Sequence, residues 1–243
     1  MNKNFLVLLS LCAIAVTALA YYGIYMDKSD VNKEKGVRYY ITKGSASCAS
    51  EESRELYTEN YIIQKNGGIR EIFSKTSGNE SETSQLICQS SDKVIRYAFD
   101  DKGELSGKTV ITGEDYDGYF WWGSYAVWSL DSVEVGQKWG GNITTKAYYT
   151  ENQQFLLIDT MDLYCETEVL AYEEVKVEAG SFDCYKVKLV QSGEYEKEKT
   201  KKAVKYTITL WYSPDLKIIV KDIFISQFGD YECTNRSELI EYE

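Results

Sequence analysis

The sequence predicts a mainly β chain of antiparallel strands with little helix. Apolar residues alternate with polar ones in two stretches, 175–190 and 208–225, as they do in strands with one buried face. Tyrosine, with 21 residues, is abundant, and it belongs with Val, Ile, Thr and Trp to the residues that favour strands. No stretch shows a sustained helical period with caps, so we expect at most one or two helical turns, near 51–56 or within 118–130.

The first 25 residues predict an export signal or a membrane anchor. Phe5 to Tyr25 carries no charge, and Ala18-Leu19-Ala20 fits a signal-peptide cleavage site. A run of this length is also long enough to span a bilayer uncleaved, so that residues 5–25 would hold the chain on the membrane. Lipid attachment at Cys12, in Leu-Ser-Leu-Cys, is a third possibility. All three place residues 26–243 outside the cytoplasm as one β domain, secreted or anchored to the outer face of the cytoplasmic membrane.

The remaining elements are short strands separated by Gly, Asn and Asp turns, the spacing of a sandwich or an open barrel. We expect strands at 37–43, 55–64, 69–75, 85–89, 93–99, 108–112, 143–150, 154–159, 163–177, 182–190, 208–212, 217–225 and 239–242. The charged run 194–202 between two of them is most simply a solvated hairpin tip.

Two hairpins are specific enough to predict their pairing. Residues 175–177 should pair with 182–190 across a four-residue turn at 178–181. Residues 208–212 should pair with 217–225 across a turn that holds the chain's only proline, Pro214. On the return strand of the first hairpin the alternation slips by one between Cys184 and Val187, which predicts a bulge.

Composition and motifs exclude several functions. The net charge of −11 repels phosphate backbones and anionic head groups, so we expect no nucleic-acid partner. Without histidine the chain can form neither a Ser-His-Asp triad nor a Cys-His pair, and it cannot bind zinc through imidazole. It lacks nucleotide-binding glycine loops and CxxC pairs, so we expect no cofactor and no metal. The acidic stretch 114–118 lacks the first and last ligands of a calcium loop and is read as a solvated turn.

Modification sites suit an exported domain. Five cysteines beyond the leader are disulfide candidates, and because five is odd, at least one does not pair within the chain. Cys48 with Cys88 is slightly favoured, while Cys184 is as well explained by burial as by pairing. Three Asn-x-Ser/Thr sequons permit glycosylation in loops or at strand edges. The candidates are Cys48, Cys88, Cys165, Cys184 and Cys233 for disulfides, and Asn79, Asn142 and Asn235 for glycans.

One stretch carries a resemblance. VKVEAGSFDCYKVKL, from Val175, resembles the V-x-V-P-A-G-x-F signature of exported β-rich proteins of unknown function, which are similar in architecture to the lipoprotein carriers LolA and LolB. Val135–Trp139 and the strand pair from Leu210 resemble the pattern's other two parts. Glu178 stands where the pattern has Pro, and Lys217 where it has Gly. The resemblance implies a curved antiparallel sheet, a half-barrel with an apolar concave face, and it carries over no catalytic residue.

The aromatic segment 116–128 is the candidate ligand site. Two adjacent tryptophans cannot both face one side of a strand, so one of Trp121 and Trp122 needs a ligand, membrane or partner to cover it. The other possibility is that both rings are buried in the core by a second layer of the same domain. The candidate residues are Tyr119, Phe120, Trp121, Trp122, Tyr125 and Trp128.

Three functions follow from these observations. The first is a non-enzymatic cell-envelope protein that binds a lipid, another apolar ligand or another envelope component. The second is an extracytoplasmic hydrolase that works with two carboxylates about 5–10 Å apart. The third is a structural surface domain without a ligand. The first is favoured, and the discriminating observation is whether inward-facing acids converge.

Overall fold

The computed structural model describes residues 34–47, 53–64, 67–77, 82–89, 93–100, 102–114, 133–151, 154–197, 200–229 and 231–243, some of them by their backbone alone. These residues form twelve strands, and no helix among them is long and apolar enough to cross a membrane. The strands are β1 (Glu34–Ala46), β2 (Ser53–Gln64), β3 (Gly67–Ser77), β4 (Glu82–Gln89), β5 (Lys93–Phe99), β6 (Leu105–Glu114), β7 (Lys138–Glu151), β8 (Gln154–Val177), β9 (Gly180–Lys197), β10 (Thr200–Ser213), β11 (Ile218–Phe228) and β12 (Tyr231–Tyr242).

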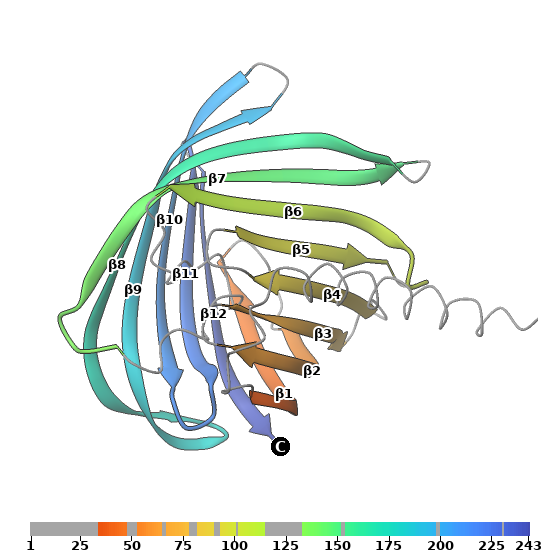
Figure 1. The fold of residues 1–243 in the computed structure, drawn as a ribbon. Coiled ribbons are helices and arrows are strands. Elements are labelled where there is room, and N and C mark those ends of the chain that lie inside the picture. The colour runs from red at the N-terminus through yellow and green to blue at the C-terminus, as the bar shows by residue number, and fades with distance from the viewer. Residues whose placement is uncertain are drawn as a thin grey trace, which may run out of the picture. The chain divides into compact units, whose positions relative to one another are not determined.

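Each strand pairs antiparallel with the next along the chain, which confirms the predicted β class and the curved antiparallel sheet (Figure 1). The order also returns to its start, because β1 pairs with β12 from Tyr40↔Tyr242 to Ala46↔Asn235. A half-barrel has two open edges. Here the first and last strands meet, so the sheet is a closed barrel.

The strand predictions hold with two differences. Residues 154–159 and 163–177 belong to one long strand, β8, rather than to two elements. Residues 53–56, where a helical turn was expected, begin strand β2 instead, since their backbone pairs with both β1 and β3. Glu194–Lys202 lies at the β9–β10 hairpin, as predicted, with Lys201 bonded to Glu194 at 2.9 Å.

Both predicted hairpins are confirmed. Val175 pairs with Phe182, and the chain turns through two residues rather than four, because Val177 already pairs with Gly180. Gly180 has φ of +141°, a conformation that side chains disfavour. In the second hairpin Ile208 pairs with Phe224.

The predicted bulge is misplaced. Strand β9 runs through Cys184–Val187 without an inserted residue, and the extra residue is Leu170, on the facing strand β8. The alternation slips because the buried face of β9 changes sides: Val187 belongs to one apolar cluster and Cys184 to another. The same change is visible in β10, where Tyr212 belongs to the first cluster and its neighbour Trp211 to the second. Successive strand residues point to opposite faces, so the two clusters lie on opposite faces of the sheet.

The larger group, here called the main cluster, gathers side chains from β4 to β10. Full burial of such side chains stabilises a fold by about 1.5–3 kcal/mol each. Its members are Ile87, Val94, Ile111, Val133, Ile143, Leu163, Cys165, Val169, Val187, Leu189, Val204, Tyr206, Ile208, Leu210 and Tyr212. The smaller end cluster comprises Val175, Val177, Cys184, Trp211, Ile218, Val220 and Leu239.

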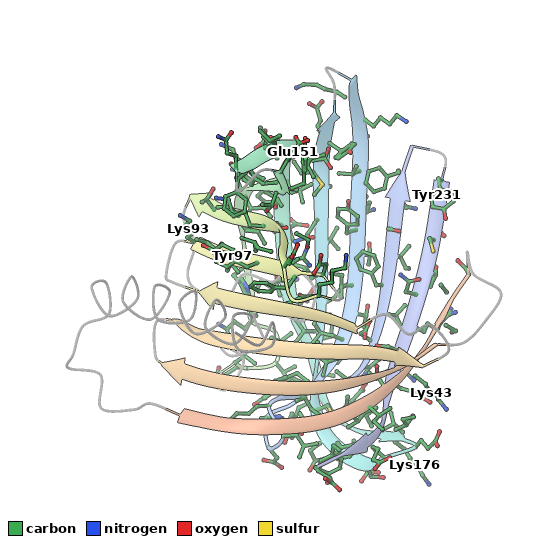
Figure 2. The ribbon with its side chains drawn as sticks, turned by 90° about the vertical axis from the view of Figure 1, so that its right-hand side faces the viewer. Lys43, Lys93, Tyr97, Glu151, Lys176 and Tyr231 are labelled. Atoms are coloured by element: carbon green, nitrogen blue, oxygen red, sulfur yellow. The ribbon has the colours of Figure 1, made fainter. Side chains whose placement is uncertain are left out.

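A polar clamp ties the β8–β9 turn to β12 beside the end cluster. Lys43 Nζ lies 3.0 Å from carboxylate oxygens of both Glu178 and Glu238. Its hydrogen bond to Glu178, and to a smaller extent its hydrogen bond to Glu238, raises the pKa of Lys43. Ala179 N–H donates to the carbonyl of Leu239 at 3.4 Å. Glu178, which departs from the resembled pattern's Pro, is therefore a partner of this clamp. Figure 2 shows Lys43 toward the end of the sheet opposite to Glu151.

Candidate functional site

The six aromatic residues predicted to bind a ligand, Tyr119, Phe120, Trp121, Trp122, Tyr125 and Trp128, lie outside the described residues. Their role therefore stays a prediction. The described chain resumes at Val133, which is buried and belongs to the main cluster. Val133 is thus the described residue that follows the aromatic segment most closely in sequence, and it lies on the face that carries the main cluster.

We call this face of β7–β10 the inner face. Its residues come from alternate positions of neighbouring strands, because antiparallel pairing places facing residues on the same side. Ile143 of β7 pairs with Leu163 of β8, and Leu189 of β9 pairs with Ile208 of β10. All four side chains are at most 4% exposed. The inner face is mainly apolar over these four strands, with Thr145, Thr167 and Gln191 as its buried polar side chains.

An aromatic group continues the inner face onto β11. The Tyr206 ring stacks on Phe224 with centroids 5.8 Å apart and meets Phe228 edge-on at 5.9 Å. The Tyr195 ring also meets Phe228 edge-on, with centroids 5.7 Å apart. This group was not predicted from the sequence, although the alternation of Val204, Tyr206 and Ile208 indicates it. Such pairs stabilise by about 0.5–1.5 kcal/mol beyond their buried area.

A few polar groups interrupt the apolar surface. Tyr206 Oη donates to Met161 Sδ at 3.7 Å, and Tyr195 Oη donates to Asp159 Oδ1 at 3.0 Å. Gln191, 1% exposed, shares a hydrogen bond with Cys165. Burial raises the pKa of the Cys165 thiol to about 12, and this hydrogen bond opposes the shift. The thiol is therefore protonated at neutral pH and is a poor nucleophile.

Thr145 differs from these groups. Its side chain is 2% exposed, on the inner face between Ile111 and Met161, and its hydroxyl has no hydrogen-bond partner among the residues that the structure describes. An unsatisfied buried hydroxyl costs about 1–3 kcal/mol. Apolar walls with few polar groups are the usual lining of small-molecule sites. Thr145 therefore presents, on the inner face, a hydroxyl that no described residue satisfies; the Thr150 hydroxyl, also on β7, is likewise buried without a described partner.

Carboxylates do not converge on this face. The partly buried acids at inner-face positions of its described strands are Asp159 and Asp222, whereas Glu168, between Thr167 and Val169, lies on the opposite face. Asp222 lies level with Val169 of β8. The two are connected across the sheet by successive pairs: Asp222 with Leu210, Leu210 with Val187, and Val187 with Val169. Asp159 is ten residues earlier on β8, roughly 33 Å away along the strand. Paired acid–base carboxylates need about 5–10 Å. Nor do the described residues contain a cluster of three or more metal-binding side chains.

The modification candidates divide clearly. Cys165 and Cys184 are free and buried, whereas Cys233 is disulfide-bonded. The side chains of the favoured pair, Cys48 and Cys88, lie outside the described part of the chain, and so does Asn79. Asn142 and Asn235 were expected in loops or at strand edges. They lie inside β7 and β12, each paired on both sides and with an exposed side chain.

Comparison with known proteins gives weak similarities only. No family profile and no curated protein matches the chain. A Bacteroides fragilis protein, provisionally described as exported and with a YmcC-like fold, aligns at 13% identity and a TM-score of 0.45 over 86% of this chain and 96% of its own. A protein of Parabacteroides distasonis, provisionally described as a lipoprotein, gives 15% and 0.41 over 86% and 96%. The hypothetical lipoprotein YmcC of Escherichia coli gives 11% and 0.35 over 84% of each chain.

Proposed function

We propose that this chain is a non-enzymatic, extracytoplasmic protein that holds a lipid or another apolar ligand against the inner face of its sheet. The observation that carries the proposal is the buried Thr145 hydroxyl, which has no partner among the described residues on a mainly apolar wall. A ligand with an apolar body and one hydrogen-bonding group would complete it. The charge-free segment at residues 5–25 supports export or anchoring.

The number of strands supports the same function. A closed sheet of about eight strands is filled by the side chains of its own wall. Twelve strands enclose a wider interior, which needs further atoms to fill it. We propose that the ligand supplies part of those atoms. In this proposal the segment's tryptophans lie at the mouth of the inner face and contact the ligand.

The hydrolase alternative gains no support from the described residues, because Asp159 and Asp222 are far apart in register. The favoured class is therefore ligand binding, and the test concerns one hydroxyl. Thr145→Val keeps the shape of the side chain and removes the hydrogen-bonding group. The matched control is Thr144→Val, which changes the neighbouring residue on the opposite face, where Thr144 donates to Asp162 at 2.6 Å.

The protein purified from its membrane is titrated with a fluorescent fatty acid, and its organic extract is examined by mass spectrometry. We expect Thr145→Val to weaken probe binding by about five- to tenfold, the effect of one lost hydrogen bond. Thermal stability should not fall, since the fold loses only an unsatisfied group. Thr144→Val should leave probe binding unchanged. Equal binding by the wild type and Thr145→Val, or no binding and no extracted ligand, contradicts the proposal.

A further inference from the structure

The β7–β8 hairpin carries a run of exposed apolar residues away from the inner face. Phe155, Leu156, Leu157 and Ile158, at the start of β8, are 36% to 55% exposed. Lys108 Nζ lies 3.9 Å from the centre of the Phe155 ring, so part of this surface is already packed. Four consecutive apolar residues place apolar side chains on both faces of the strand.

This run is also an edge. On one side it pairs with β7, from Thr150↔Phe155 to Ala147↔Asp159. On its other side, pairing with β9 begins only at Thr160↔Glu196. Within the described strands, the backbone groups of residues 154–158 therefore have no neighbour on that side. Figure 1 shows this part of β8 at the rim of the drawn strands.

Exposed strand edges are normally protected by charge, because an open ladder pairs with other chains. The β9–β10 hairpin end has that protection, with Glu194 and Lys201 in an ion pair and Lys202 exposed. The start of β8 has none over four residues. We propose that this edge is a self-association site, where the start of β8 pairs antiparallel with the same strand of a second copy around a two-fold axis.

The sequence of this run suits self-pairing, because one register sets apolar residues opposite apolar residues and no acid opposite another acid. Two-fold antiparallel pairing places one residue opposite itself. Centred on Leu156, it sets Leu156 against Leu156 of the partner subunit and Phe155 against Leu157 of the partner subunit. Asp159 then faces no acidic residue and no apolar ring. The polar end of the hairpin, with Glu151 and Gln154, argues against a bilayer, which penalises a buried carboxylate.

The first experiment measures mass. The full chain in mild detergent is followed by size-exclusion chromatography with light scattering over micromolar concentrations, for wild type, Leu156→Lys and Tyr231→Lys. Tyr231 is 57% exposed on β12 and serves as the matched control. We expect a wild-type dimer, at least tenfold weaker association for Leu156→Lys, and no change for Tyr231→Lys. A monomeric wild type, or a dimer indifferent to Leu156→Lys, overturns the proposal.

The second experiment tests the register and does not depend on the folding of the charged variant. Facing residues in an antiparallel pair have Cβ atoms about 4.5–5.5 Å apart, close enough for a disulfide. Mild oxidation should convert Leu156→Cys into a covalent dimer and leave wild type and Tyr231→Cys uncross-linked. No cross-linking of Leu156→Cys refutes the pairing, even if the protein associates with vesicles or with a peptide through this edge.

Discussion

Trp211 and Glu173 are joined by a hydrogen bond across strands that are not neighbours. The indole Nε1 of Trp211 on β10 donates to Oε1 of Glu173 on β8 at 2.8 Å, over the intervening strand β9. From β9, Lys186 lies 3.8 Å from the same carboxylate oxygen and 5.0 Å from the indole ring centre. The arrangement gives the end cluster a polar cover and fixes the orientation of its largest ring.

Trp211→Phe should destabilise the fold by about 1–3 kcal/mol, since it removes the hydrogen bond to a charged acceptor and part of the buried ring. Glu173→Gln is the matched variant, because its amide oxygen can still accept from the indole while the ion pair with Lys186 is lost. We expect its effect to be the smaller of the two. Urea unfolding measures both, and equal losses would contradict the role given to the indole hydrogen bond.

Lys217→Gly should stabilise the chain. Lys217 has φ of +56°, and it is the only residue other than glycine with positive φ among those described. A side chain in this conformation costs roughly 1–2 kcal/mol, against roughly 0.5–1 kcal/mol for the extra freedom of glycine. We expect a net gain of about 0.5–1 kcal/mol, measured by denaturant unfolding. Lys217→Ala keeps the strained side chain and should give no such gain.

Asp222→Asn should change the pH dependence of stability. Burial raises the pKa of Asp222, and the hydrogen bond from Ser237 opposes the shift. The carboxyl binds its proton more tightly in the folded chain, so stability is highest below the ordinary value of 3.8 and falls as pH rises through the folded pKa. Asparagine removes this loss. The Tm difference between variant and wild type should grow from about pH 4 to pH 7, and a constant difference would refute it.

Cysteine chemistry should follow the structure. Burial raises the pKa of the Cys184 thiol to about 12, as it does for Cys165, so both resist alkylation in the folded protein at pH 8. Mass spectrometry should find both labelled only after unfolding, without a reductant. Cys233 should be labelled only after reduction, since it is disulfide-bonded. Rapid labelling of Cys165 in the folded chain would disagree with its burial.

Local patterns predicted the strands well because alternation and turn chemistry are properties of neighbouring residues. They also located the slip in the apolar–polar alternation between Cys184 and Val187. The sequence does not show whether such a slip comes from an inserted residue or from a strand whose buried face changes sides. That distinction depends on what packs on each face. The resembled pattern has Gly where this chain has Lys217. That glycine also has a local explanation, because a positive φ is a property of one residue.

Long-range relationships could not be predicted in this way. Nothing in β1 or β12 alone indicates that the two strands pair, so the closure of the sheet was missed. The disulfide state of Cys233 and the absent partner of Thr145 likewise depend on residues distant in sequence. The aromatic group of Tyr206, Phe224 and Phe228 was within reach, because each of these residues follows the alternation of its own strand.

The pairing of β1 with β12 has a consequence for biogenesis. Of the described strands, β1 is synthesised first and has one permanent neighbour in β2, but its other neighbour, β12, is made last. Joining strands so distant in sequence is slow, because the entropy of the intervening loop is lost before the contact forms. Until then β1 and β11 each present an open ladder. The barrel can therefore close only after synthesis has passed β12. A chain interrupted earlier keeps two unpaired strand edges, by which quality-control proteases and chaperones can recognise it.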